Sequence, residues 1–434
     1  MNSIWEKDAE RPIFKGLDGD IKTDVLIIGG GICGILCAFM LKKAGVDCVL
    51  AEADKICGST TGYTTAKITF QHGAFCQKLI KKYGEEKAML YIKAQTDAIQ
   101  EYRKLSREIS CDFKESDSFV YSRTNREIIE KEAHALCKIG CDAVFCEKTA
   151  LPFSVAGAVG VKNQAEFNPL KFCFSIAKDL KIYENTRITE LTPTFAATEK
   201  GKIYAEKIIV ATHFPFINKH GSYFIKLYQH RSYVTALKNA PPLNGMYVDE
   251  DIKGLSFRNY KGYLLLGGGS HRTGKQGGGW KELEECAKSY YPQSSAVFRW
   301  ATQDCMTPDG IPYIGQYSKN TPNFFVATGF NKWGMTSSMV AAKILRDQIL
   351  GKQNDFAEIF SPKRSIFHPQ LAVNMGESLL GMLTPTTPRC PHLGCALKYN
   401  KAEHSWDCSC HGSRFTESGK VINNPANKDI NNMP

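Results

Sequence analysis

Short apolar runs alternate with longer helical stretches along most of this chain. Residues 24–28 (DVLII) have the length and continuous apolar character of a buried strand. A second strand is predicted over Cys48–Ala51, and the apolar stretch 35–44 between the two strands is predicted to be helical. Strand, helix and strand in this order are typical of a parallel βαβ unit, so the pattern predicts an α/β fold.

Two long insertions interrupt this pattern, over about 74–180 and 223–300. The first begins with amphipathic helices that are broken near Gly84, and the second contains alternating strands over 231–237 and 263–266. The α/β pattern then returns with a strand over 324–327 and a helix that ends near Leu350. Residues 361–389 are basic, contain several prolines and show little strand alternation, so a linker is expected over 356–384.

Composition limits the class of protein. The 434 residues exceed a single ordinary domain, and no apolar stretch is expected to span a membrane. The net charge of +11 is dispersed along the chain, and no basic-aromatic motif supports nucleic-acid binding. An acidic electron carrier or an anionic substrate would complement this charge. The N-terminus lacks a signal pattern, and most of the sixteen cysteines are scattered, so a cytoplasmic location is expected.

Two cysteine–histidine boxes lie near the C-terminus. The first, CPHLGC, contains Cys390 and His392, and the second, CSCHGS, contains Cys408 and His411. Two thiolates and two imidazoles in facing loops are the ligands of a Rieske [2Fe–2S] centre, in which the histidines raise the reduction potential. The same four residues could instead hold a tetrahedral zinc ion.

The surrounding residues resemble the Rieske family. Cys395 and Cys410 match a pair that forms a disulfide between the two cluster loops in the high-potential members. Ser413 matches a serine whose hydroxyl donates to a bridging sulfide, and residues 424–426 (NPA) match the proline loop that covers the cluster. Phe415 differs from the respiratory members, where a tyrosine donates to a cysteine sulfur. The resemblance therefore implies a potential below the top of the roughly −150 to +300 mV Rieske range.

A glycine-rich loop at the other end predicts a dinucleotide site. The sequence GGGICG follows the first strand and opens the helix, so Gly29, Gly31 and Gly34 form a G-x-G-x-x-G motif. Glu52 follows the second strand, with seventeen residues between Gly34 and this glutamate. The glycines allow the pyrophosphate to approach the helix N-terminus, and the acidic residue binds the ribose hydroxyls.

Later segments resemble FAD-dependent oxidoreductases of the D-amino-acid oxidase and glycine oxidase superfamily. The hydroxyl-rich loop 58–67, the strand 207–212, the segment TPDGIPYIG at 307–315 and the segment GFNKWGMT at 329–336 carry this resemblance. Segment 329–336 opens the helix that ends near Leu350, and the N-terminus of such a helix would stabilise the anionic reduced flavin. The expected FAD contacts are the following residues: Gly29, Gly31, Gly34, Glu52, Ser59, Thr60, Thr61, Thr65, Lys67, Gly310, Gly334, Met335 and Thr336.

The two resemblances together imply a bacterial two-domain family, in which a flavoprotein carries a C-terminal Rieske module. The expected architecture is a Rossmann-like FAD domain, an α+β substrate domain with a mixed or antiparallel sheet, and a small all-β module. The ranges are 20–73, 181–222 and 301–355 for FAD binding, 74–180 and 223–300 for substrate, and 385–434 for the module, with residues 1–355 forming the oxidoreductase. The module is shorter than a complete Rieske domain, because few strands can precede its first box.

The resemblance implies a dehydrogenase or oxidase that acts on the C–N bond of a small amine or amino acid. Its electrons would pass from the flavin through the [2Fe–2S] cluster to an external acceptor. Arg258, Tyr260 and His271 are candidates for substrate contact, because an arginine paired with a tyrosine can bind a carboxylate. Two alternatives stay open: a redox-sensing or electron-transfer flavoprotein without its own substrate, and an FAD enzyme for a macromolecule-bound amine.

Overall fold

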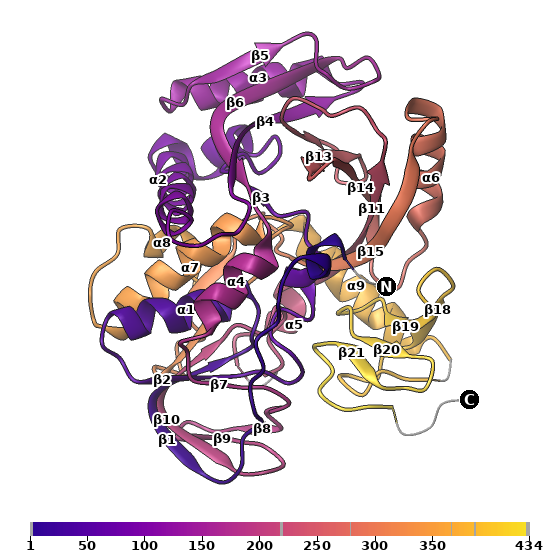
Figure 1. Cartoon of the computed structure of the whole chain (residues 1–434). Helices are drawn as coiled ribbons and strands as arrows, with labels where there is room; N and C mark the ends of the chain where they lie inside the picture. Colours follow the sequence, from indigo (N-terminus) through magenta and orange to yellow (C-terminus); the bar gives the residue numbers. More distant parts are fainter. Residues whose placement is uncertain (1–2, 218–219, 278, 366, 386–387, 431–434) are drawn as a thin grey trace.

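The computed structural model describes residues 3–217, 220–277, 279–365, 367–385 and 388–430. Its strands form three sheets, which correspond to a lower, an upper and a small C-terminal part of the molecule (Figure 1). The mixed α/β fold with a small all-β C-terminal sheet confirms the predicted fold class.

The first sheet has the order β16–β17–β10–β1–β2–β7, and β9 with β8 continues from β10. Its strands are β1 (Ile21–Ile28), β2 (Cys48–Ala51), β7 (Ile182–Tyr183), β8 (Glu190–Leu191), β9 (Phe195–Ala197), β10 (Lys202–Val210), β16 (Tyr313–Gln316) and β17 (Phe324–Thr328). The central strands β17, β10, β1, β2 and β7 run parallel. Because β1 is buried on both faces, Val25 and Ile27 belong to one hydrophobic core, and Leu26 and Ile28 belong to another.

Helices α1 (Ile32–Lys43) and α7 (Gly334–Ile349) pack against each other, and α4 (Pro169–Ala177) packs on α1. Both α1 and α7 begin directly after a parallel strand. Their N-termini therefore lie at the carboxyl edge of the sheet, where open α/β sheets bind ligands.

The second sheet has the order β15–β11–β14–β13–β12–β4–β6–β3, with β5 beside β6. Its strands are β3 (Lys67–Ile68), β4 (Lys114–Ser122), β5 (Ala143–Cys146), β6 (Gly157–Glu166), β11 (Tyr228–Lys238), β12 (Met246–Asp249), β13 (Ser256–Tyr260), β14 (Tyr263–Arg272) and β15 (Ser295–Met306). All of its pairs are antiparallel except β12 with β4.

The remaining elements surround these two sheets. They are the 3₁₀ turns η1 (Ile4–Lys7) and η2 (Thr60–Tyr63), and the helices α2 (Cys76–Leu105), α3 (Arg126–Lys138), α5 (Tyr223–Lys226), α6 (Gly279–Tyr290), α8 (Ala357–Phe360) and α9 (Pro369–Leu383). Helix α2 is kinked at Gly84, which has a φ of 83°, as the sequence predicts. Segment 356–384, expected as a linker, instead contains α8 and α9.

The C-terminal sheet is an antiparallel meander with the order β18–β19–β20–β21. Its strands are β18 (Leu397–Asn400), β19 (Ser405–Cys408), β20 (Arg414–Thr416) and β21 (Val421–Asn423). A small core of its own contains the four box cysteines together with Leu397, Phe415 and Ala426.

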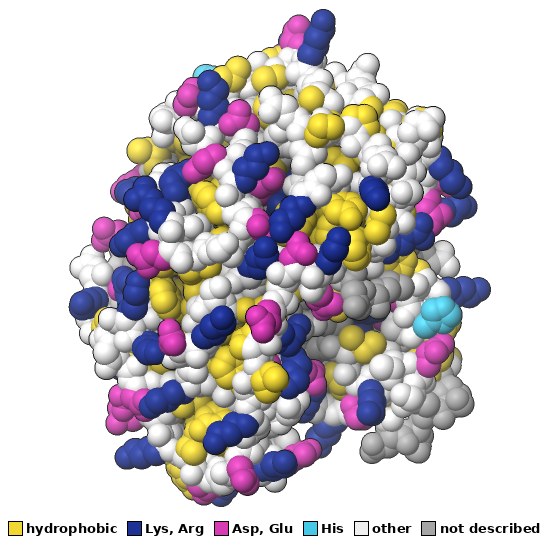
Figure 2. Space-filling view, viewed as in Figure 1, with side chains coloured by type: hydrophobic (Ala, Val, Ile, Leu, Met, Phe, Trp, Pro, Cys, Tyr) yellow, Lys and Arg dark blue, Asp and Glu magenta, His cyan; other side chains and the backbone are white. Residues whose placement is uncertain are grey.

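Charged side chains are spread over the visible face of the molecule, with cationic and anionic groups interspersed (Figure 2). None of the helices in the described part of the chain is long and apolar enough to cross a membrane.

Candidate functional site

The glycine loop between β1 and α1 brings backbone segments into close contact. Gly29 has a φ of +110°, and a Cβ there would lie 2.6 Å from the Ala211 carbonyl oxygen. A Cβ on Gly34 would lie 1.9 Å from the Gly29 carbonyl oxygen. The Ile32 amide at the start of α1 donates to Thr61 Oγ1 at 3.0 Å. These approaches require glycine and leave the helix N-terminus facing outward from the sheet.

Glu52 ends β2 beside this loop. Its carboxylate accepts hydrogen bonds from the Gly30 amide at 2.6 Å and the Asp54 amide at 2.9 Å. Burial raises the pKa of Glu52, although both amide donors act in the opposite direction. The carboxylate therefore lies where a ribose hydroxyl can donate to it.

A cavity of about 1260 Å³ extends from this loop to the second sheet. This volume exceeds the range of ordinary small-molecule pockets, and it suits an extended dinucleotide together with a substrate. Most of the expected FAD contacts line it, namely Gly29, Gly31, Glu52, Ser59, Thr60, Thr61, Thr65, Lys67, Gly310, Gly334 and Met335. Gly34 and Thr336 are not among the lining residues, because Gly34 lies under the glycine loop and the Thr336 hydroxyl donates to the Thr69 carbonyl.

The N-terminus of α7 lies at this cavity. Trp333, which precedes the helix, stacks on His72 with ring centroids 4.9 Å apart. Burial lowers the pKa of His72 to about 3, so this imidazole is neutral, and its Nδ1 lies 2.8 Å from the Tyr91 hydroxyl. The sequence analysis did not identify His72, because no motif surrounds it.

Two lysines also line the cavity. Burial, together with the nearby Arg258 guanidinium, lowers the pKa of Lys67 to about 7. Burial also lowers the pKa of Lys332, whose ammonium group donates to Ser270 Oγ at 2.9 Å. The Asp304 carboxylate, which also lines the cavity, opposes this lowering, and sequence analysis did not identify Lys332.

The three residues expected to contact the substrate lie outside the cavity lining. Arg258 donates to the carbonyls of Thr65 and Ala66 at 2.7 and 2.8 Å. The Tyr260 hydroxyl donates to Asp112, and His271 Nδ1 lies 3.2 Å from the Gly269 carbonyl oxygen. Arg258 thus supports the loop that leads into the cavity, and neither Arg258 nor Tyr260 lines its interior.

The two cysteine–histidine boxes form two loops with the same backbone pattern. The Cys390 amide donates to Cys395 and the Gly394 amide to Cys390, each at 2.9 Å. In the second loop, the Cys408 amide donates to Ser413 and the Gly412 amide to Cys408, again at 2.9 Å. The two loops therefore have the same backbone conformation around their first cysteine.

The four expected metal ligands lie near one another in two pairs, one of thiols and one of imidazoles. The thiols of Cys390 and Cys408 interact, and the rings of His392 and His411 lie edge to face with centroids 5.0 Å apart. His411 is 1% exposed, and its Nδ1 has no hydrogen-bonding partner among the described residues. An unpartnered, buried imidazole nitrogen beside two thiols fits metal ligation.

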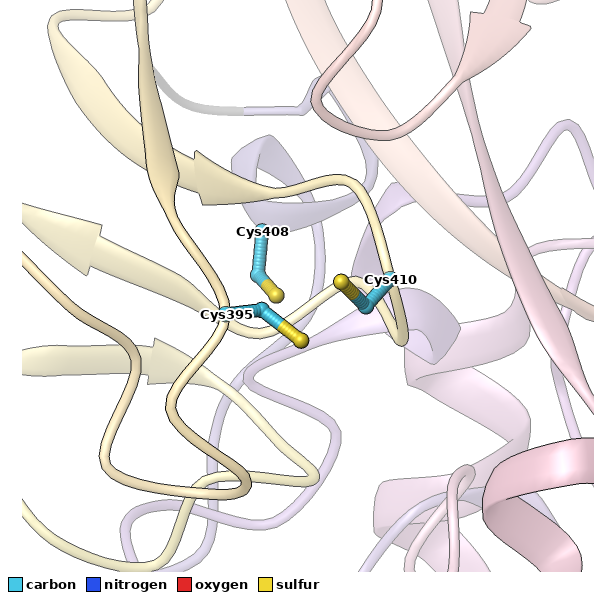
Figure 3. Close-up of side chains that lie close together, drawn as sticks. All are labelled: Cys395, Cys408 and Cys410. Carbon is cyan, nitrogen blue, oxygen red and sulfur yellow. The ribbon is translucent and has the colours of Figure 1, made fainter. Parts of the chain in front are cut away.

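Cys395 and Cys410 lie beside these ligands. Both have free thiols, and their Sγ atoms and that of Cys408 lie within 4.8 Å of one another (Figure 3). The disulfide between Cys395 and Cys410 stays a prediction. Ser413 Oγ accepts a hydrogen bond from the Ala426 amide at 3.0 Å, which ties the proline loop to the second box.

The second box sits directly on the wall of the cavity. The Gln229 side-chain amide donates to the His411 carbonyl at 2.8 Å, and the Gln303 amide donates to the Gly412 carbonyl at 2.8 Å. Gln303 also donates to Gln229 at 2.6 Å and itself lines the cavity. A buried chain of hydrogen bonds therefore joins the cysteine–histidine loop to the cavity.

A buried group of charged side chains lies at the interface between the C-terminal module and the second sheet. Glu403 of the C-terminal module pairs with Arg231 of β11 and, at 2.9 Å, with Arg414 of β20. Arg414 also donates to Asp407 at 2.9 Å. Burial raises the pKa of Glu403, but Arg231 and Arg414 outweigh this effect and lower it overall. Sequence spacing contains no signal for this cluster, because its members lie far apart in the chain.

The fold and the two sites define a flavin-dependent oxidoreductase with a Rieske iron–sulfur module. A family model described as FAD dependent oxidoreductase matches residues 24–348, and a model described as Rieske [2Fe-2S] domain matches residues 348–434. The chain therefore belongs to the FAD-dependent oxidoreductase family and carries a C-terminal Rieske domain. Its cofactors are FAD and a [2Fe–2S] cluster.

Known proteins resemble the chain in the same way. YhfW of Bacillus subtilis, whose name describes it as a Rieske 2Fe-2S iron–sulfur protein, is 33% identical, with 99% of this chain and 96% of YhfW covered. Glycine oxidase from Geobacillus kaustophilus has a TM-score of 0.68 at 19% identity, covering 80% of this chain and 100% of the oxidase. L-proline dehydrogenase from P. horikoshii has a TM-score of 0.66 at 18% identity, covering 80% and 98%.

Proposed function

We propose that this protein oxidises the C–N bond of a small amine or amino acid and passes the electrons through its own cluster to an external acceptor. The observation that carries this proposal is the contact between the second cysteine–histidine box and the flavin cavity. Gln303 lines the cavity and donates to the Gly412 carbonyl within that box. The flavin and the cluster would therefore lie on opposite sides of Gln303.

The two cofactors supply the difficult chemistry: bound FAD accepts an electron pair, and the cluster carries electrons one at a time. The protein supplies position and charge. Glu52 would accept from the ribose, and the N-terminus of α7, which lines the cavity, would place its positive end toward the flavin ring. Cys390, His392, Cys408 and His411 would hold the cluster.

Substrate recognition would involve residues of the cavity itself. Arg231 lines the cavity, but its guanidinium already pairs with Glu403. We propose that Lys332 binds an anionic group of the substrate, because it lines the cavity and its ammonium group donates to the neutral Ser270 hydroxyl and the Ile252 carbonyl. The Asp304 carboxylate, which also lines the cavity, favours the charged form of this lysine. The similarity to glycine oxidase and L-proline dehydrogenase favours an amino-acid carboxylate as the anionic group.

The test is anaerobic addition of candidate amines and amino acids, followed by optical and paramagnetic resonance spectra. A true substrate should bleach the flavin absorption and then produce the signal of a reduced Rieske cluster. Bleaching without cluster reduction would contradict internal transfer. Failure of every small amine, with chemical reductants still reducing both centres, would favour an electron-transfer flavoprotein without its own substrate.

A further inference from the structure

Helix α9 buries polar residues and exposes apolar ones, which is the reverse of an ordinary surface helix. Its polar and small residues face the protein: Asn374 is 2% exposed, and its amide donates to the Ile225 carbonyl at 3.1 Å. Asn374 Oδ1 accepts from Arg272 at 3.0 Å, and Glu377 pairs with Lys275 at 2.7 Å. A surface helix normally buries its apolar stripe and exposes its polar one.

The apolar side chains of α9 point to solvent. They form what we call the outward face of α9, with the exposed fractions Val373 51%, Met375 56%, Leu379 59%, Leu380 63%, Met382 43% and Leu383 70%. Phe367, just before the helix, is 89% exposed. Large aliphatic side chains gathered on one helix mark an interaction site, whereas single exposed apolar residues do not.

This helix lies against the cluster loops. A Cβ on Gly381 would lie 2.4 Å from Cys410 Sγ, and Ser378 Oγ lies 3.4 Å from His411 Nε2. His392, the other imidazole ligand, is only half-buried. Whatever covers the outward face of α9 would therefore lie about one helix diameter from the cluster, roughly 10 Å.

The charged groups at α9 include one neutralised carboxylate and one cation. Glu377 is the one carboxylate of the helix, and Lys275 pairs with it. Arg389 lies at the C-terminal end of the helix, donates to the carbonyls of Met382 and Thr384, and stays half-exposed. The whole chain has a net charge of +11. An anionic surface would complement this arrangement.

We propose that the outward face of α9 binds the surface of a lipid bilayer that contains anionic lipids. The face presents no hydrogen-bonding or charged side chain, whereas protein interfaces contain about one hydrogen bond per 100–200 Å². An aliphatic helix face inserts into the membrane interface, and the half-exposed Arg389 beside it, on a chain of net charge +11, would attract anionic lipids. If the proposed function is correct, this contact would bring the cluster to a lipid-soluble electron acceptor.

Sedimentation of the anaerobically purified holoprotein with vesicles tests the proposal. Two vesicle compositions are compared: phosphatidylcholine alone, and phosphatidylcholine with a minority of phosphatidylglycerol. The wild type should sediment with the mixed vesicles more than with the neutral ones. The triple variant Leu379→Gln, Leu380→Gln, Leu383→Gln should bind the mixed vesicles at least about tenfold more weakly than the wild type, since three leucines no longer enter the bilayer.

The matched control is the double variant Met89→Gln, Val144→Gln, which changes side chains of 50% and 51% exposure on α2 and β5. This control should bind as the wild type does, and flavin and iron contents verify that each variant is folded. Wild type that stays in solution with both vesicles, or a triple variant that binds equally well, would overturn the proposal. So would a dimer that the triple variant loses while no vesicle binding occurs, because a second copy would then cover the face. No substrate is added, so this result is independent of the proposed oxidation.

Discussion

Phe415 is the residue at which this Rieske module differs from its respiratory relatives, and it is fully buried in the small core of the module. A phenyl ring donates no hydrogen bond to a ligand sulfur. We predict that Phe415→Tyr raises the reduction potential of the cluster by about 40 mV, which corresponds to one hydrogen bond of about 1 kcal/mol. A redox titration monitored by paramagnetic resonance measures this shift. A wild-type potential already near the upper end of the Rieske range would contradict the premise.

Substitution of Lys332 should change the affinity for the substrate much more than the turnover number. Removal of its charge by Lys332→Met should raise KM for an anionic substrate by about tenfold, the equivalent of one charge-assisted hydrogen bond. The turnover number should change much less, because the ammonium group binds the substrate equally before and during the reaction. Lys332→Arg should retain part of the affinity. An unchanged KM in Lys332→Met would show that another group binds the substrate.

At the scale of elements, strands β11 and β15 connect the flavin cavity to the second cysteine–histidine box. Gln229 of β11 is 2% exposed and donates to His411 and Asn424 carbonyls at 2.8 and 3.1 Å. The side chain does not line the cavity. It therefore positions the cluster loop without contacting the flavin or the substrate.

Gln229→Leu should slow reduction of the cluster by about tenfold, because it leaves buried carbonyls without donors and shifts the loop. Stopped-flow spectroscopy with substrate should show flavin reduction at its normal rate, followed by delayed cluster reduction. Gln316→Leu is the matched control, since Gln316 lies on β16, donates to the nearby Ser318 carbonyl and accepts from Lys363, and neither partner belongs to the C-terminal module. Equal cluster kinetics in the two variants would exclude a positioning role for Gln229.

At the scale of the whole molecule, the buried charges at the interface tie the Rieske module to the flavoprotein. Glu403 has a lowered pKa because Arg231 and Arg414 outweigh its burial. A carboxyl group with a lowered pKa in the folded state contributes stability that is present above its ordinary pKa of about 4.3 and is lost as the pH falls through the lowered value. The interface should therefore loosen only below about pH 4.

Glu403→Gln should reproduce this loosening at neutral pH, because it leaves two buried guanidinium groups with one carboxylate. Removal of one partner from a buried ion pair costs about 3–5 kcal/mol. Limited proteolysis between α9 and the first box should then become faster, and cluster reduction by the flavin should become slower. Glu417→Gln, on the exposed surface of the same module, serves as the control. A Glu403→Gln variant that resists proteolysis like wild type would contradict the proposed tie.

The metal content tests the cluster itself. Protein purified without oxygen should contain iron and acid-labile sulfide, and Cys408→Ser should lose both while it retains FAD. The flavin site and the cluster site are built from separate segments, so the loss of one should leave the other occupied. Zinc without sulfide in the wild type would contradict the Rieske assignment.

Both cofactor classes could be predicted from the order of residues along the chain. A glycine loop with Glu52, and two boxes with Cys390, His392, Cys408 and His411, act through spacing along a short stretch of chain, and such spacing is visible without a structure. The α/β class was predictable for the same reason, since a buried parallel strand is a continuous apolar run.

How the two centres meet depends on the packing of segments that are distant in the sequence. Gln229, Gln303, Arg231 and Glu403 carry no motif, because they become neighbours only when β11, β15 and the C-terminal module pack together. The same packing turned Arg258 toward backbone carbonyls and away from the cavity, and placed Lys332 inside it. The same packing leaves the leucines of α9 exposed, because the polar side of this helix contacts the rest of the protein.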